Sequence, residues 1–351
     1  MSLGKLPPEL YLMIMGNLES QGQLKSLSSL SRTCPTLYEL GNPILYEASF
    51  NHESKICAAL GWAISRNCTG ISMKLIEYGM PVNELFQEDA YKYKRLLTPL
   101  AMAAEQGRTE IVRQLLNVPE INVNVICAYE KTALHHAVIS RNVEIVNLLL
   151  AQEGILIDAK CDAGLTPLSL AVSGGNADIV RLLLAQGPLV DPDSRSNRGW
   201  SPLFIAVEHE VDAEVVKLLL DTGRVDVNFI DPVSRFTPLI VAVQNNLPDI
   251  ARLLVSHPTI DPNLGAHNNQ VVPIATAASR GFTEIVRILL SHPQTDPDRA
   301  IMARSRAILQ ADIWGHEEIV SMLLADGRVG QESRQLLQGQ RILSQKPCAW
   351  L

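Results

Sequence analysis

Residues 164–187 read GLTPLSLAVSGGNADIVRLLLAQG, and this stretch predicts two short helices joined by a tight turn. The Thr166 hydroxyl can cap the first helix, and Pro167 loses no hydrogen bond at the first helical position. Gly174 and Gly175 end that helix. The second helix, ADIVRLLL, is apolar around most of its circumference, which is more than two helices of about ten residues can bury alone. The stretch therefore needs neighbours of its own kind.

Similar units recur along most of the chain. They start at Thr98, Thr132, Thr166, Ser201, Thr237 and Val272, with spacings of 34, 34, 35, 36 and 35 residues, and a weaker start follows at Arg306. Each has a second apolar stretch: EIVRQLL at 110–116, EIVNLLL at 144–150, DIVRLLL at 178–184, EVVKLLL at 214–220, DIARLLV at 249–255, EIVRILL at 284–290 and EIVSMLL at 318–324. A period near 34 residues predicts a solenoid whose core grows by stacking.

The T-P-L-x-x-A pattern with a later I-V-x-x-L-L resembles the ankyrin repeat over residues 56–327. The resemblance implies an all-α solenoid of about eight helix-turn-helix repeats with short β-turn or hairpin tips. A degenerate first unit aligns from Ala58. The next start comes 40 residues later, so 84–97 holds an insertion, which contains Tyr91, Tyr93 and Lys94.

Composition and charge exclude several classes of protein. The balance of 30 Lys and Arg against 37 Asp and Glu gives −7, and no basic block stands out, so we expect no nucleic-acid partner. The chain shows no signal-peptide pattern and no apolar run of 18 residues, and its six cysteines are scattered. We expect reduced thiols and a cytoplasmic or nuclear location.

Residues 6–47 lack the 34-residue period and have two amphipathic segments of their own. Pro7 and Pro8 can start a helix in which Leu10, Ile14 and Leu18 form one apolar stripe. After a polar turn, apolar residues again recur at spacings of three and four. One interpretation is a helical cap over the open end of the stack.

The sequence pattern L-P-x-E-L-x-x-x-I, followed by a Leu, a polar turn and L-x-x-L, resembles an F-box. The closing stretch 43–47 resembles the end of many fungal F-boxes. This likeness implies that the segment docks on the Skp adaptor of a cullin–RING ubiquitin ligase by helix-in-groove recognition. The residues it assigns to the adaptor are Leu6, Pro7, Leu10, Ile14, Leu18, Leu24 and Leu27. Two features depart from the family: the turn between Leu18 and Leu24 differs in length by about one residue, and no aromatic residue follows Cys34.

Ankyrin stacks expose their turn tips and the polar edge of each first helix on one concave side. The resemblance therefore assigns a second set of residues to a protein partner: Arg95, Glu105, Gln106, Tyr129, Lys131, Arg198, Trp200, Glu208, His209, Arg235, Phe236, Gln244, Asn245 and Arg280. Trp, Tyr, Phe and Arg are common binding anchors. Trp200 and Phe236 precede Ser201 and Thr237 directly, so packing between turns is the alternative for these two.

Nothing in the sequence has the pattern of an active site, a metal site or a cofactor site. His135, in T-A-L-H-H-A, falls where the ankyrin family uses a structural histidine, and His257 and His292 precede prolines in turns. Four Asp-Pro pairs begin at Asp191, Asp231, Asp261 and Asp296, and we interpret them as markers of the same turn in each unit.

We therefore predict a non-enzymatic interaction protein in three parts: an F-box-like helical domain at 1–50, ankyrin repeats at 56–327, and a helical or flexible tail at 328–351. Its function is either target recognition in a Skp–cullin–F-box ligase or a plain ankyrin scaffold whose first helices only cap the stack. The last four residues, Cys348 to Leu351, fit C-a-a-X, so Cys348 is a candidate for lipidation. Its flanks lack a second membrane signal, and we expect no membrane partner.

Overall fold

The computed structural model describes residues 60–61, 63–77, 80–88, 95–266, 271–299 and 306–345. The F-box-like segment with its adaptor-binding residues, the centre of the 84–97 insertion and Cys348 lie outside these ranges. The described residues form two compact units that divide between Asp162 and Ala163. Below, unit 1 denotes the described residues up to Asp162, and unit 2 denotes those from Ala163 onward.

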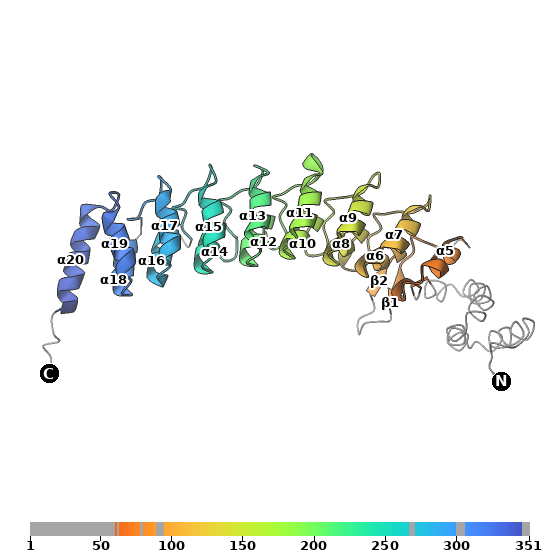
Figure 1. Cartoon of the computed structure of the whole chain (residues 1–351), viewed down its shortest axis with the longest axis horizontal. Coiled ribbons are helices and arrows are strands. Elements are labelled where there is room, and N and C mark those ends of the chain that lie inside the picture. The colour runs from red at the N-terminus through yellow and green to blue at the C-terminus, as the bar shows by residue number, and fades with distance from the viewer. Residues whose placement is uncertain are drawn as a thin grey trace, which may run out of the picture. The chain divides into compact units, whose positions relative to one another are not determined.

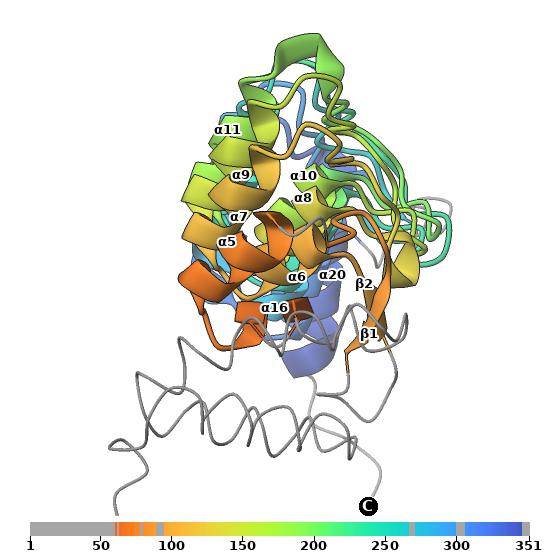
Figure 2. The same ribbon diagram turned by 90° about the vertical axis from the view of Figure 1, so that its right-hand side faces the viewer.

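Unit 1 consists of helix pairs and one small hairpin (Figure 1). Its elements are α5 (Thr69–Glu77), β1 (Phe86–Glu88), β2 (Arg95–Leu97), α6 (Pro99–Glu105), α7 (Thr109–Leu116), η2 (Ala128–Glu130), α8 (Ala133–Ile139) and α9 (Val143–Leu150). Helices α5, α7 and α9 form one layer and α6 and α8 a second, with the hairpin on the far side of the second layer (Figure 2).

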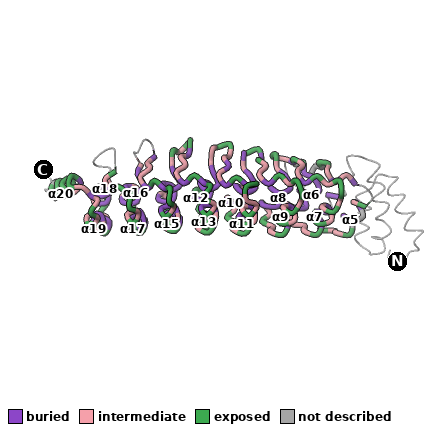
Figure 3. The backbone as a smooth tube through the Cα atoms, turned by 90° about the horizontal axis from the view of Figure 1, so that it is seen from above, coloured by how far each residue is buried: buried purple, intermediate pink, exposed green. Residues whose placement is uncertain are grey.

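Unit 2 continues the same pairing. Its helices are α10 (Pro167–Ser173), α11 (Ala177–Leu184), η3 (Gly187–Leu189), α12 (Pro202–Glu208), α13 (Ala213–Leu220), α14 (Pro238–Gln244), α15 (Pro248–Val255), α16 (Pro273–Arg280), α17 (Thr283–Ser291), α18 (Ala307–Ile313), α19 (Glu317–Ala325) and α20 (Gln331–Gln345). The second helices α11 to α19 line up in one row beside the first helices, and buried residues concentrate between the rows (Figure 3).

The T-P-L motif starts first helices as predicted. Thr166, Ser201 and Thr237 each accept a hydrogen bond from the backbone N–H three residues on, at 3.2 Å in every case. The following proline takes the first helical position, where no N–H is needed. His135 has a structural role in the same place, because its Nδ1 accepts from the backbone N–H of Thr132 at 3.1 Å.

Apolar side chains from both helices of each pair form the core of the stack. Leu183, Leu203, Leu239 and Leu289 all have at most 1% of their surface exposed. Alternate helices contact across repeats within each unit, as α11 does α13 and α12 does α14. Each repeat therefore depends on its nearest neighbours for burial.

A ladder of side-chain amides joins successive loops. Asn228 Nδ2 donates to the Thr259 carbonyl at 2.7 Å, and its Oδ1 accepts from the Asp261 N–H at 2.9 Å. Asn263 makes the same pair of bonds one repeat later, to Gln294 O and Asp296 N. These bonds satisfy backbone groups that the loops cannot pair internally.

The insertion after the first repeat contains an antiparallel hairpin. Phe86 pairs with Leu97 and Glu88 with Arg95, so β2 leads directly into the Thr98 cap of α6. The sequence predicts short hairpins at the repeat tips in general. It does not predict that the hairpin in this insertion is longer than the other tips.

Helix α20 covers α18 at the C-terminal end of unit 2. Arg341 Nε and Gln340 Nε2 both reach the Asp312 carboxylate, at 2.6 and 2.7 Å, and Leu337 is buried. Its outer surface carries Gln335, Gln338 and other exposed residues. A largely polar outer surface is what a terminal cap of a repeat stack needs. Among the described helices, none is long and apolar enough to cross a membrane.

Candidate functional site

The partner-binding residues predicted from sequence fall into two rows in unit 2. The turn row precedes the first helices and holds Arg198, Trp200, Arg235 and Phe236. The helix-end row holds Glu208, His209, Gln244, Asn245 and Arg280. Both rows are largely exposed, while Trp200, Phe236 and Gln244 are half-buried.

Trp200 packs between two turns and remains partly open. Its Nε1–H donates to Asp231 Oδ1 at 2.9 Å, and its ring lies 5.4 Å from the Phe204 ring. The Arg198 guanidinium sits 5.6 Å from the centre of the same indole. Trp200 therefore links its own turn to the next one and supports an exposed arginine.

The turn before α14 is built around the Asp231 carboxylate, which is 1% exposed. Oδ2 accepts from the Ser234 N–H at 2.5 Å and Oδ1 from Trp200. Burial alone would raise the pKa of Asp231, but the hydrogen bonds from Ser234, Val233 and Trp200 together lower it below its ordinary value. Asp231 is thus a buried anion that fixes this turn.

This role corrects the interpretation of the four Asp-Pro pairs. Asp191, Asp261 and Asp296 each accept from the N–H two residues on, in the loop after a second helix. Asp226, not Asp231, makes that bond in its repeat, to Asn228 N. Asp231 lies five residues after Asp226, in a different turn. Its Asp-Pro pair therefore does not mark the same turn as the other three pairs.

The helix-end row is tied together by polar contacts across repeats. Ser173 Oγ and His209 Nδ1 lie 2.9 Å apart, and Arg280 Nη1 donates to the Gln244 carbonyl at 2.9 Å. The row continues into the last repeat with Ile313 and Trp314, which are 50% and 64% exposed. Sequence reasoning missed these two as binding residues, although their offset from the repeat start would have found them.

In unit 1, the structure places the predicted residues on the corresponding elements. Arg95 lies in β2, Tyr129 is 52% exposed in η2, and Lys131 Nζ lies 5.4 Å from the Tyr129 ring centre. Glu105 ends α6, and Gln106 is its C-cap.

A cysteine, a histidine and a glutamate occur on neighbouring elements of unit 1. His136 is 2% exposed, and its Nδ1 lies 3.8 Å from Glu105 Oε1. Burial raises the pKa of the Cys127 thiol, and its contact with Thr98 only partly offsets this, so the thiol is protonated at neutral pH. A protonated buried thiol is a poor nucleophile. Among the described residues, no group of three His, Cys, Asp or Glu side chains is placed to hold a metal ion.

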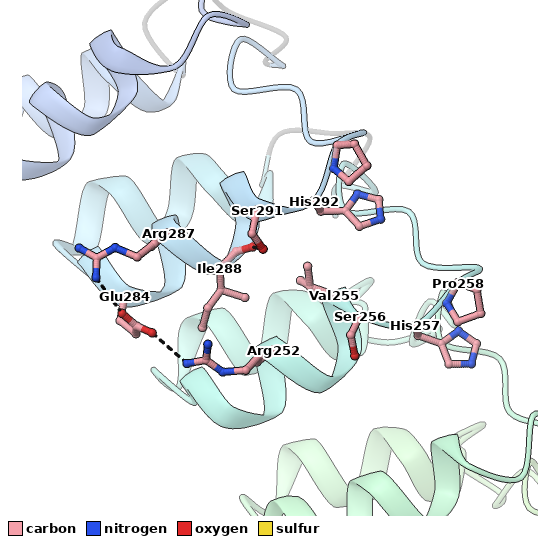
Figure 4. Close-up of a pocket in the computed structure, with 11 residues that line it drawn as sticks. Arg252, Val255, Ser256, His257, Pro258, Glu284, Arg287, Ile288, Ser291 and His292 are labelled. Carbon is pink, nitrogen blue, oxygen red and sulfur yellow. Dashed lines mark hydrogen bonds and ion pairs between the residues drawn. The ribbon is translucent and has the colours of Figure 1, made fainter.

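A pocket of 390 Å³ opens on the second-helix side, between α15 and α17 (Figure 4). Glu284 lies on one side of it and pairs with both Arg252, at 2.9 Å, and Arg287, at 3.2 Å. His257 and His292 lie toward the other side, in turns that their Nδ1 atoms help to form. Because its arginines are already paired with a carboxylate, this pocket offers little unpaired charge to a ligand.

The comparisons with known proteins agree with this architecture. The family model for ankyrin repeats (3 copies) matches residues 60–161 and 168–266, which is more than half of the chain. The chain therefore belongs to the ankyrin-repeat family. Its fold is similar to the crystal structure of the ankyrin repeat domain of Bcl-3, described as a unique member of the IkappaB protein family. The TM-score is 0.57 at 27% sequence identity, over 65% of this chain and 99% of that one. A comparison with curated protein sequences found no match.

The ankyrin-repeat fold is a non-catalytic scaffold for binding other proteins. Exposed side chains on turns and helix ends, held by a rigid stack, are what such a scaffold presents to a partner.

Proposed function

We propose that this chain is the target-recognition subunit of a Skp–cullin–F-box ubiquitin ligase. The observation that carries the proposal is the L-P-x-E-L-x-x-x-I pattern at residues 6–14, placed directly ahead of a run of ankyrin repeats. The two parts divide the work. The N-terminal segment binds the Skp adaptor, and the turn and helix-end rows bind the target protein.

The mechanism requires no chemistry from this chain. A target held on the ankyrin repeats has its lysines at a raised effective concentration near the ubiquitin-loaded enzyme of the ligase. The chain contributes binding and orientation, which agrees with a non-catalytic scaffold. Specificity for the target then depends on the exposed side chains of the two rows.

Titration calorimetry of the full chain with purified Skp adaptor tests the proposal. We expect micromolar or tighter binding by the wild type. Leu10→Asp and Ile14→Asp are expected to abolish it, because each puts a charge into the apolar stripe that enters the adaptor groove.

Leu12→Asp is the matched control, because the helical period predicts Leu12 on the opposite side from that stripe. It should retain adaptor binding. If the wild type does not bind the adaptor, the ligase role is wrong, and the chain is a plain ankyrin scaffold.

A further inference from the structure

Two pairs of exposed arginines in unit 2, one on the second helices and one in the turn row, differ in whether a carboxylate lies beside them. On the second helices, Arg181 pairs with Glu214 at 2.6 Å and Arg252 with Glu284 at 2.9 Å. Arg198 and Arg235, in the turn row, are exposed, and no described carboxylate lies within 4.0 Å of either guanidinium. The turn row therefore carries two cations that no carboxylate in the described part of the chain neutralises.

These two arginines lie on turns that touch each other. Gly199, next to Arg198, has φ of +82°, and a Cβ there would lie 2.8 Å from Pro232 Cγ. Only glycine allows this approach of the two turns. The Trp200–Asp231 hydrogen bond joins the same turns at 2.9 Å. Arg198 and Arg235 are thus presented by one braced structure.

Arg235 occupies a left-handed backbone conformation, with φ of 59°. The residue two positions before the helix cap is glycine in the two preceding repeats of unit 2, at Gly164 and Gly199, whereas Glu130 has the same left-handed conformation in unit 1, with φ of 53°. This conformation is sterically unfavourable for most residues other than glycine. Such local strain is concentrated at functional sites, and here it places an exposed arginine at the tip of a turn.

The acidic side chains discussed next bind groups other than the Arg198 and Arg235 guanidinium groups. Asp193 Oδ2 pairs with Arg195 at 2.6 Å, and Asp226 lies 4.0 Å from the same guanidinium. Both carboxylate oxygens of Asp231 accept hydrogen bonds, from Trp200 and Ser234. Exposed Glu208 is at the opposite end of α12 from the Arg198 turn.

We propose that Arg198 and Arg235 form a binding site for an acidic segment of the target protein. This inference rests on the proposed role of the ankyrin repeats in target binding and names the chemistry of the target. Guanidinium groups bind carboxylates through paired hydrogen bonds, which fixes orientation as well as charge. Val233, 80% exposed in the Arg235 turn, offers an apolar contact to the same segment.

The net charge of the chain makes the prediction specific. A protein of net charge −7 repels acidic peptides on average, so binding must come from local positive charges that the described carboxylates do not pair. We therefore expect the site to prefer segments that contain Asp and Glu, although the net charge of the protein is unfavourable to them. The site also predicts affinity that falls with ionic strength.

Fluorescence anisotropy with the full chain tests this site. The probes are a fluorescein-labelled (Glu-Ser-Leu-Asp)₃ peptide, its counterpart with lysine at every acidic position, and a single-stranded RNA of about the same length and charge. We expect the wild type to prefer the acidic peptide. The Arg198→Ala/Arg235→Ala double variant should bind it at least about 10-fold more weakly, since hydrogen bonds between charged groups are stronger than those between neutral groups.

Arg181→Ala/Arg252→Ala is the matched control, because it removes the same charge from the second helices. It should leave peptide affinity within about two-fold of the wild type, since exposed paired charges contribute little. Circular dichroism melts show that each variant is folded.

Three results would overturn the site: no acidic-peptide binding by the folded wild type, unchanged affinity in the turn-row variant, or equal loss in the control. Preference for the RNA would instead assign the arginines to nucleic acid. Leu10→Asp should leave peptide affinity unchanged. Failure of adaptor binding with intact peptide binding therefore removes only the ligase role.

Discussion

Asn228 joins two consecutive repeats by holding both sides of the Asp261 loop: its amide donates to the Thr259 carbonyl and accepts from the Asp261 N–H at 2.9 Å. We predict that Asn228→Ala lowers the free energy of unfolding by about 1 kcal/mol for each bond lost. Urea unfolding measures this. Asn245→Ala, at an exposed residue of the same unit whose side chain makes no hydrogen bond to the described residues, serves as the comparison, and an equal loss there would argue against a special role for the ladder.

Leu183, in α11, is fully buried in the core of unit 2. Leu183→Ala should cost about 2–5 kcal/mol because it leaves a cavity between helices. Hydrogen exchange should show the largest loss of protection in α11 and α13 and progressively less toward α19, since coupling is between nearest neighbours. Uniform loss throughout unit 2 would contradict local coupling.

The Arg235→Gly variant distinguishes the contribution of Arg235 to fold stability from its contribution to peptide binding. Glycine relieves the left-handed strain at φ of 59°, about 1–2 kcal/mol, but adds about 0.5–1 kcal/mol of backbone entropy to the unfolded chain. We predict a variant that is as stable as the wild type or up to about 1.5 kcal/mol more stable, with weaker acidic-peptide binding. Thermal melts and anisotropy measure the two effects. A clearly less stable protein would mean that Arg235 is retained for the fold.

Asp231 makes the stability of unit 2 depend on pH. Its pKa is lowered in the folded state, so its contribution is full above the ordinary value and is lost as pH falls through the folded value. Asp231→Asn should therefore be less stable than the wild type at pH 7, and this difference should shrink below about pH 4. A difference that stays constant from pH 7 to 3 would show that the Asp231 charge does not stabilise the fold.

The repeat architecture was predictable from sequence because each unit carries its own start signal and its own apolar period. Thr166, Pro167 and Leu183 alone define a cap, a first helical position and a buried face. Family patterns also placed Arg198 and Arg235 on exposed turns. These are local properties, and the stack repeats them.

The contacts between turns were not predictable. The link from Trp200 to Asp231 spans 31 residues and depends on two loops of unequal length. The unequal spacings of 40, 30 and 35 residues between the Asp-Pro pairs indicate that Asp231 belongs to a different turn. The Asp-Pro motif itself is the same in all four places and does not distinguish the turns. The strain at Arg235 likewise depends on a backbone angle that its residue type disfavours.

We propose that one chain joins a ligase adaptor to an acidic target through two separate surfaces. The most direct test is ubiquitin transfer by the reconstituted ligase to a lysine-containing carrier fused to the (Glu-Ser-Leu-Asp)₃ peptide. We predict transfer with the wild-type chain and with Arg181→Ala/Arg252→Ala. Leu10→Asp and Arg198→Ala/Arg235→Ala should each abolish it. Equal transfer with Leu10→Asp, or no transfer above the level seen without this chain, would contradict the account.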